Sequence, residues 1–151
     1  MNNGTLLPEI KTPVPGPNSR SWVDRLAMRE CPAITARRSR RASVLGAVDD
    51  DPIVWAEAVG SNVLDVDGNR YVDLTAGFGV ASAGHRNPNV MNAAKSQLDH
   101  LAHVMGDAYP DTQRIVLLEK LAEKTGLQRS ILGSSGSDGV EAALKTGRIM
   151  S

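Results

Sequence analysis

Small residues cluster just before the last predicted helix. Residues 133–139 read Gly-Ser-Ser-Gly-Ser-Asp-Gly. They lie between a short strand predicted at 130–132 and a strongly helical stretch at 140–145. The first amides of a helix have no partner inside it, and the helix dipole adds partial positive charge there. Gly136 lets a ligand approach the backbone closely, and Ser137 can donate from its amide and its hydroxyl. The loop predicts a phosphate site, with a plain strand-to-helix connection as the alternative.

The named phosphate motifs do not fit this loop. A P-loop requires Gly-x-x-x-x-Gly-Lys-Ser/Thr, and the chain contains no such run. Glycines at 133, 136 and 139 are three apart, unlike the Gly-x-Gly-x-x-Gly of dinucleotide-binding folds. A nucleophile elbow would need a glycine where Ser137 stands. These mismatches still allow the loop to bind a phosphate-bearing cofactor outside those classes.

A run of oxygen-bearing side chains, Asp65-x-Asp67-x-Asn69, begins like a calcium-binding loop. Such a loop needs a glycine at its sixth position and a glutamate at its twelfth. Arg70 and Ala76 occupy those positions. We therefore interpret the run as a hairpin turn rather than a calcium site.

The histidines and lysines form no pattern typical of catalysis or metal binding. His100 and His103 stand three apart, as two ligands of one metal can, but no third ligand is placed beside them. A Schiff-base lysine requires an apolar pocket. The chain's lysines instead lie on charged sides of predicted helices or in the N-terminal segment, at 95, 120, 124, 145 and 11. We assign no catalytic residue and no metal ligand.

The N-terminal third must be mostly extended. Residues 1–18 contain four prolines and are predicted to lie over a surface. Residues 19–30 are predicted to form a helix, with Ser21 and Asp24 as its capping box. The basic run at 37–41 could bind phosphates or nucleic acid, but we favour a solvated or subunit-contacting face because the chain as a whole is neutral.

The middle of the chain predicts a small sheet followed by helices. Turn formers separate three apolar runs that form an antiparallel meander, at 53–55, 63–66 and 71–74. One helix is predicted to run from its cap Asn87 to Met105, and a second from Asp111 to a stop at Gly126. In the last helix, Asp138 with Glu141 fits a capping pair.

Composition excludes several classes of protein. Lysine plus arginine and aspartate plus glutamate both number 17, so the net charge is zero. Proteins that bind nucleic acid normally have an excess of basic residues, which this chain lacks. Cys31 is the single cysteine, so no internal disulfide can form. No apolar run approaches the ~20 residues of a membrane span, and the first residues lack a secretory pattern. We expect a cytoplasmic protein that binds neither nucleic acid nor membrane.

Four motifs occur in order along the chain. They are Asp-Gly-Asn-Arg-Tyr-Val-Asp-Leu at 67–74, Ala-Gly-Phe-Gly-Val at 76–80, Gly-His-Arg-Asn-Pro-Asn-Val at 84–90 and Ser-Gly-Ser-Asp-Gly-Val-Glu-Ala-Ala-Leu-Lys at 135–145. This order resembles the class III aminotransferases, pyridoxal-phosphate enzymes that include 4-aminobutyrate, acetylornithine and ornithine aminotransferases. The N-terminal segment is most similar to members that act on 4-aminobutyrate or other ω-amino acids.

The resemblance implies an α/β chain, the N-terminal part of the fold type I architecture, in which a small antiparallel meander precedes the large-domain sheet. The implied domains are an extended arm with a short helix (1–50), the meander and its helix (51–105), and the start of the cofactor-binding domain (106–151). Gly136 and Ser137 would hold the phosphate of pyridoxal 5'-phosphate, and Phe78 would line the substrate pocket. Family members are homodimers that take an amino donor and a 2-oxo acid.

The implied reaction moves an amino group from an ω-amino acid such as 4-aminobutyrate to a 2-oxo acid such as 2-oxoglutarate. Asp138 and Gly139 depart from the family's Glu and Ala. The Schiff-base lysine and the ring-binding residues lie further along in the family, so we expect this chain alone to be inactive. The alternatives are an aminomutase, racemase or decarboxylase of the same fold, or a non-catalytic fragment that binds phosphate or a partner.

Overall fold

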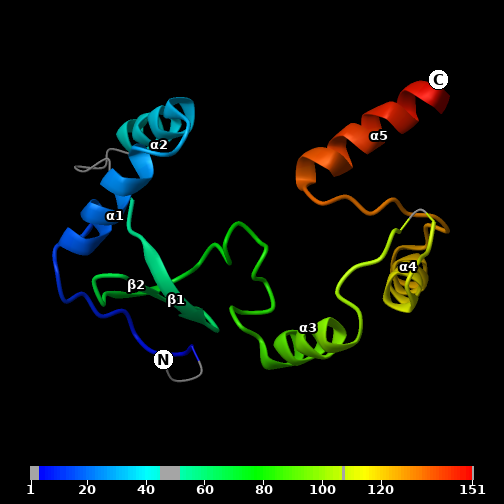
Figure 1. Ribbon diagram of the computed structural model, residues 1–151, viewed down its shortest axis with the longest axis horizontal. Helices are drawn as coiled ribbons and strands as arrows, with labels where there is room; N and C mark the ends of the chain where they lie inside the picture. The colour runs from blue at the N-terminus through cyan, green and yellow to red at the C-terminus, as the bar shows by residue number, and fades with distance from the viewer. Residues whose placement is uncertain (1–3, 45–51, 107, 151) are drawn as a thin grey trace. The chain divides into compact units, whose positions relative to one another are not determined.

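The computed structural model of the chain describes residues 4–44, 52–106 and 108–150. Contacts divide the chain into two compact units, Met1–Ser96 and Gln97–Ser151. The elements are helices α1 (Pro17–Ala27), α2 (Pro32–Val44), α3 (Pro88–His100), α4 (Thr112–Thr125) and α5 (Gly136–Met150), and strands β1 (Trp55–Val59), β2 (Asn62–Asp65) and β3 (Arg70–Val72). Figure 1 labels all of them except β3. The expected boundaries at 50 and 105 concern the family's domains and stay a prediction.

The three strands form the antiparallel meander that the sequence predicts, in the order β1-β2-β3. The strand predicted at 53–55 is present, but its bounds differ, because β1 begins at Trp55 and continues to Val59. Val59 pairs with Asn62 across a two-residue turn, so the strand residues are those immediately before that turn. The turn between β2 and β3, with Gly68 at φ 84°, confirms the hairpin interpretation of the acidic run.

Polar side chains make up most of the buried interior of the first unit. Among the described residues, Val23 and Val63 are the only buried hydrophobic side chains, whereas Ser19, Asn62, Asp65 and Asn69 are at most 1% exposed. No buried side-chain nitrogen or oxygen of the described residues lacks a hydrogen-bond partner. Because a buried polar group destabilises a fold unless it is paired, this network defines the packing of the unit.

Asp65 is the centre of the network. Its carboxylate accepts hydrogen bonds from the Asp67 amide (2.9 Å), the Asn69 amide (2.8 Å) and side chain (2.9 Å), and the Tyr71 hydroxyl (2.7 Å). Burial by itself would raise the pKa of Asp65, but these hydrogen bonds together hold it below its ordinary value. Burial, reinforced by the Asp65 charge, raises the pKa of Tyr71 to about 12.

Two asparagines attach the N-terminal segment to the sheet. The Asn62 side chain accepts from the Leu6 amide and donates to the Leu6 carbonyl, both at 2.8 Å. Asn69 accepts from the amides of Lys11 (2.7 Å) and Thr12 (3.0 Å). An isolated bridge between Glu9 and Arg70 continues the pairing beyond β3. The extended N-terminal segment thus lies along the sheet, as the prolines predict.

Asp67 caps α1 from a distant part of the chain. Its carboxylate accepts the amides of Asn18 (2.7 Å) and Ser19 (2.8 Å), in the first turn of the helix. A Cβ at Gly16 would lie 2.3 Å from the Asp67 carboxyl carbon, so only glycine admits this cap. The predicted capping box at Ser21 is wrong, because the helix begins four residues earlier, at Pro17.

The basic run at 37–41 lies on α2, a helix that the sequence analysis does not predict. Arg38 forms a two-pronged ion pair with Glu30, one bond of which measures 3.0 Å. The guanidinium of Arg41 lies 5.4 Å from the centre of the Phe78 ring. These two arginines therefore make contacts within the first unit.

The later helices follow their predicted caps more closely than their predicted ends. Asn87 accepts the Asn89 amide at 3.0 Å and caps α3, but the helix ends at His100 rather than at Met105. Asp111 caps α4 through the Arg114 amide (2.9 Å), and Gly126 ends it with φ 74°. Within the described ranges, no helix is both long and apolar enough to cross a membrane.

Candidate functional site

The first turn of α5 contains the predicted phosphate loop. Ser135 caps the helix, because its hydroxyl oxygen accepts the Asp138 amide at 3.2 Å. The Asp138 carboxylate turns back and accepts the Ser134 amide at 3.0 Å. The predicted cap at Asp138 with Glu141 is therefore wrong by one turn. Asp138 sits three residues after a serine, which is the partner position of a capping box.

The amides of Gly136 and Ser137 in this loop stay available. The two residues are the first of α5, where no carbonyl of the helix can accept from them. Within the described part of the chain, neither amide has another acceptor. A Cβ built on Gly136 would meet nothing within 4 Å, so the space beside the backbone is open. Two free amides in open space at a positive helix end fit a phosphate group.

A hollow of about 580 Å³ lies beside these amides. Gly136 and Ser137 line it together with Val140, Glu141 and Leu144, which lie one to two turns further along α5. The carboxylate of Glu141 is paired with Lys145 at 2.7 Å on the exposed side of the helix. That ion pair offsets the negative charge that would otherwise oppose an anion here.

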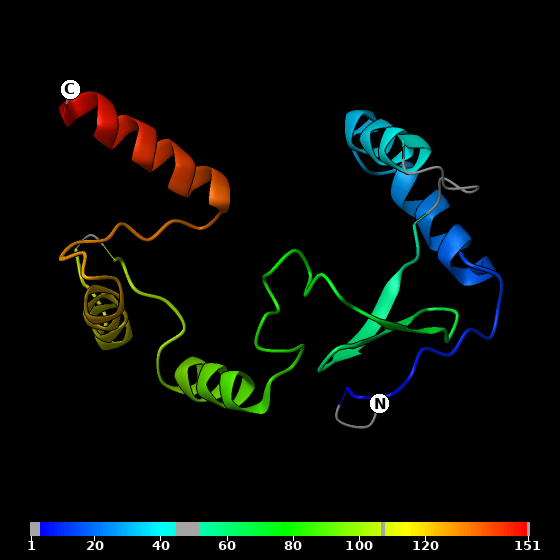
Figure 2. The same ribbon diagram turned by 180° about the vertical axis from the view of Figure 1, so that it is seen from behind.

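The segment before α5 does not form the strand predicted at 130–132. Figure 2 shows the connection from α4 to α5 as an irregular extended segment. A strand needs a hydrogen-bonded neighbour, and the three described strands pair with one another and, through one bridge, with Glu9, but not with residues 130–132. Ile131 is 76% exposed and, with Leu132 and Ala142, lines a larger hollow of about 790 Å³.

Phe78, the predicted substrate-pocket residue, lies on a loop of the first unit. The loop makes a left-handed turn, with φ of 50° at Ala76, 57° at Gly77, 60° at Phe78 and 87° at Gly79. The Gly79 amide donates to the Thr75 carbonyl at 2.9 Å and closes the turn. The left-handed region costs roughly 1–2 kcal/mol for each non-glycine residue. Interactions elsewhere in the loop must hold Ala76 and Phe78 in it.

The ring of Phe78 faces outward from this turn. The residue is 82% exposed. Exposed aromatic rings on strained backbone are typical of binding sites, where the surrounding structure maintains a costly conformation. The predicted residues therefore fall in two places, with Phe78 on the loop of the first unit and Gly136 and Ser137 on α5 of the second.

His85, to which the sequence alone gives no role, lies at the base of the Phe78 loop. Its Nε2 lies 2.8 Å from Oδ2 of Asp73, and this hydrogen bond is the main reason why the pKa of Asp73 falls to about 2. The two residues flank the glycine-rich stretch that contains Phe78. That flanking position is the signal that sequence analysis could have used.

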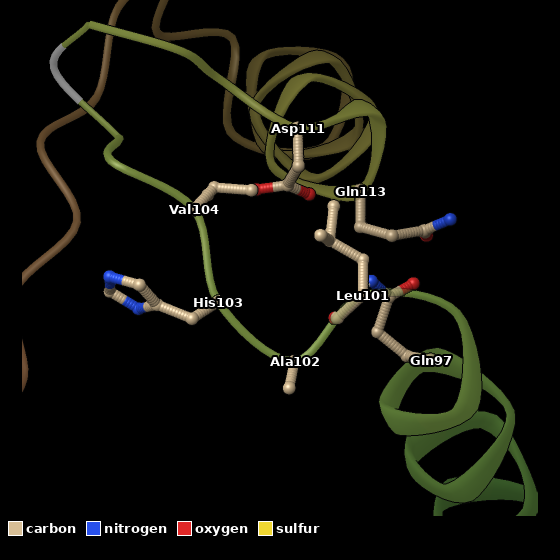
Figure 3. Close-up of a pocket in the computed structure, with 7 residues that line it drawn as sticks. All are labelled: Gln97, Leu101, Ala102, His103, Val104, Asp111 and Gln113. Atoms are coloured by element: carbon tan, nitrogen blue, oxygen red, sulfur yellow. The ribbon is translucent and has the colours of Figure 1, made fainter.

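His103 lines a small cavity of the second unit. A cavity of about 300 Å³ is lined by Gln97, Leu101, Ala102, His103, Val104, Asp111 and Gln113, and the His103 ring points away from Asp111 (Figure 3). The Asp111 carboxylate already caps α4. In the residues that the structure describes, no three histidine, cysteine, aspartate or glutamate side chains are placed to hold a metal ion.

A family model and two curated relatives all match this chain as aminotransferases. A family model described as Aminotransferase class-III matches residues 45–151. A 4-aminobutyrate aminotransferase from Mycobacterium tuberculosis is 34% identical over 142 residues, which cover 92% of this chain and 29% of that protein. An acetylornithine aminotransferase from Methanocaldococcus jannaschii is 39% identical over 97 residues, which cover 64% of this chain and 24% of that protein. The chain thus spans less than a third of either relative.

Solved structures agree with these relatives. The structure of the ornithine aminotransferase of Toxoplasma gondii matches with a TM-score of 0.58 at 26% identity. The matched region covers 90% of this chain and 30% of that one. A second structure of that protein has a TM-score of 0.59 at 28% identity, covers 91% of this chain and 30% of that one, and contains partially occupied pyridoxal phosphate at its active site. The chain is an α/β fragment that matches part of a fold type I structure.

Proposed function

The chain belongs to the class III aminotransferase family, and from that membership we propose that it is the N-terminal part of a transaminase acting on an ω-amino acid such as 4-aminobutyrate. The acceptor in this proposal is a 2-oxo acid such as 2-oxoglutarate, and the whole enzyme is a homodimer. The similarity to the 4-aminobutyrate enzyme supports this donor, because it extends over 92% of the chain and includes the N-terminal segment. The family uses pyridoxal 5'-phosphate.

The free amides at the start of α5 are the observation that carries the proposal. We infer that the backbone N–H groups of Gly136 and Ser137, with the Ser137 hydroxyl, hold the cofactor phosphate. When bound, pyridoxal phosphate supplies an aldehyde that exchanges with the amino group and a ring that withdraws electrons. Gly136 contributes by having no side chain, so the phosphate oxygens can reach both amides. In the same proposal, the Phe78 ring lines the pocket for the carbon chain of the donor.

We expect the variant Gly136→Asp to bind pyridoxal phosphate at least tenfold more weakly than the unaltered chain. The new carboxylate would occupy the open space beside the amides and repel the phosphate. Ser137→Ala should weaken binding by roughly fivefold, because it removes one hydrogen bond worth about 1 kcal/mol. Calorimetric titration of the purified chain, with pyridoxal as the phosphate-free comparison, measures both effects.

Ser134→Ala is the matched control for these variants. It shortens a serine in the same loop, but the Ser134 amide is already bonded to Asp138. Its affinity should equal that of the unaltered chain. Equal affinity of Gly136→Asp and the unaltered chain, or equal affinity for pyridoxal and pyridoxal phosphate, would contradict the phosphate assignment and leave only adducts of surface lysines.

The chain by itself should not catalyse transamination. All five lysines are exposed, namely Lys11, Lys95, Lys120, Lys124 and Lys145. A lysine that bonds covalently to a cofactor aldehyde is activated by burial in an apolar pocket. Incubation with pyridoxal phosphate, 4-aminobutyrate and 2-oxoglutarate should therefore form no more glutamate than the cofactor forms alone. Glutamate production above that level, lost when one of these lysines is replaced by alanine, would contradict this prediction.

A further inference from the structure

The loop from Asp73 to His85 is closed at its base by backbone hydrogen bonds to the β1–β2 turn. The Asp73 amide donates to the Ser61 carbonyl at 2.8 Å. The His85 amide donates to the Gly60 carbonyl at 2.9 Å, and the Gly60 amide donates back to the His85 carbonyl at 2.8 Å. Both ends of the loop are thus attached to the same turn. Compact surface loops of this kind, with their ends held together, are frequently functional.

The side chains of Asp73 and His85 close the same base a second time. Their 2.8 Å contact is protected from solvent, because the Asp73 side chain is 5% exposed and that of His85 17%. Since an ionised carboxylate can only accept, Nε2–H of the imidazole is the donor. The Trp55 ring packs edge-on against the imidazole, with centroids 5.8 Å apart. Asp73 and His85 together are called the latch below.

The latch also organises the backbone that carries Phe78. Oδ1 of Asp73 accepts from the amide (2.9 Å) and the hydroxyl (2.7 Å) of Thr75, and Oδ2 accepts from the Gly77 amide at 2.8 Å. A Cβ built on Gly77 would lie 4.0 Å from Cε1 of His85, so the imidazole packs beneath the left-handed turn. One carboxylate therefore joins the base of the loop to the residue immediately before Phe78.

Little else holds the ring of Phe78. The residue is 82% exposed, and the charged group that faces its ring is the Arg41 guanidinium, at 5.4 Å from the centroid. The direction of the ring must then follow from its backbone, which is in the left-handed region at φ 60°. That backbone is held by the Asp73 carboxylate together with two backbone hydrogen bonds, from the Gly79 amide to Thr75 and from the Ala81 amide to Ala76. The carboxylate itself is held by His85.

We propose that Asp73 and His85 are positioning residues, which hold Phe78 in its left-handed conformation so that its ring faces the hydrocarbon chain of the amino donor. The proposal rests on the proposed function for its substrate, because Phe78 lines the pocket only in that proposal. The latch itself is a property of the first unit and needs no cofactor. His85 acts through Asp73, and Asp73 acts through the Thr75 and Gly77 amides.

The test uses the single phenylalanine of the chain. Biosynthetic incorporation of 4-fluorophenylalanine into the full chain gives one ¹⁹F resonance, which comes from Phe78. We expect His85→Leu to move that resonance most of the way toward its position in urea, because the turn relaxes once Asp73 loses its donor. His85→Gln keeps an N–H near the position of Nε2 and should restore the native resonance. His103→Leu, on the second unit, is the matched control and should leave the resonance unchanged.

The backbone amide shifts of Val63 and Asn69 show whether the sheet is intact. A displaced Phe78 resonance with unchanged Val63 and Asn69 shifts supports the latch, and an unmoved resonance in His85→Leu overturns it. If that variant loses its sheet, Asp73→Asn replaces it in the test, because asparagine has the size of the native side chain and still accepts from Thr75. The latch then predicts a displaced Phe78 resonance in Asp73→Asn with an intact sheet. Loss of the sheet in both variants also overturns the positioning role, because the pair would then be a general structural element.

This readout separates the latch from the proposed function. If the chain fails to bind pyridoxal phosphate, the cofactor site is contradicted. The response of the Phe78 resonance to His85→Leu does not depend on that result. Tight phosphate binding with no response of Phe78 to His85→Leu would contradict the latch alone. The two proposals can therefore fail independently.

Discussion

Asp65→Ala should lower the free energy of unfolding of the first unit by about 3 kcal/mol. The carboxylate is 1% exposed and accepts four hydrogen bonds from Asp67, Asn69 and Tyr71. Alanine removes the acceptor and leaves buried donors without partners, which is more costly than the loss of the hydrogen bonds alone. Urea unfolding, followed by Trp55 fluorescence in a Trp22→Phe background, measures the change.

Glu57→Ala is the matched control. Glu57 is an exposed carboxylate on β1, in the same sheet, so its removal should change the free energy of unfolding by less than about 0.5 kcal/mol. The loss of stability in Asp65→Asn should fall between the two. The asparagine oxygen can still accept hydrogen bonds, but its NH₂ group would face donors that need an acceptor. A stability of Asp65→Ala equal to that of Glu57→Ala would show that the network does not hold the unit together.

The first unit should lose stability steeply as the pH falls from about 4 toward 2. Burial works against the charged forms of Asp65 and Asp67, but the hydrogen bonds that their carboxylates accept lower the pKa of both below the ordinary 3.8. The hydrogen bond from His85, followed by those from Thr75, lowers the pKa of Asp73 to about 2. Urea midpoints measured from pH 6 down to pH 2 report the loss.

The sign follows from proton linkage. A carboxyl whose pKa is lower in the folded chain binds protons more readily when unfolded, so acid favours unfolding. The stability from these carboxylates is fully present above the unfolded pKa of 3.8, and it disappears as the pH falls through the folded values. His85→Leu should weaken the part of this loss that is nearest pH 2, because it removes the main cause of the Asp73 shift. A urea midpoint that is constant from pH 6 to pH 2 would contradict the network of ionised carboxylates.

Features that depend on a few neighbouring residues could be predicted from the sequence. Asn87 and Asp111 cap α3 and α4 through amides two or three residues further on. Gly68 and Gly126 adopt the positive φ that a tight turn or a helix end requires, and glycine adopts it at no steric cost. The same reasoning places two free amides at Gly136 and Ser137, since free amides are a property of any helix start, and their use by a phosphate stays a prediction.

Features that depend on distant partners could not be predicted. The cap of α1 comes from Asp67, which is 48 positions beyond Ser19, and the Asn62 side chain bonds to Leu6 across 56 positions. The segment at 130–132 has the composition of a strand but no pairing neighbour among the described strands. A propensity becomes a strand only where a second backbone offers matching donors and acceptors.

By itself, the sequence determined the family, the antiparallel meander, the caps of α3 and α4, and which small residues could face a phosphate. Only the tertiary structure decided that Asp65 and Asn69 are buried, that Asp67 caps the start of α1, and that His85 forms a hydrogen bond with Asp73 at the base of the Phe78 loop. The physical reason is distance along the chain. A cap or a turn is decided by atoms within about four residues, whereas a buried carboxylate is stable only if folding brings it enough donors.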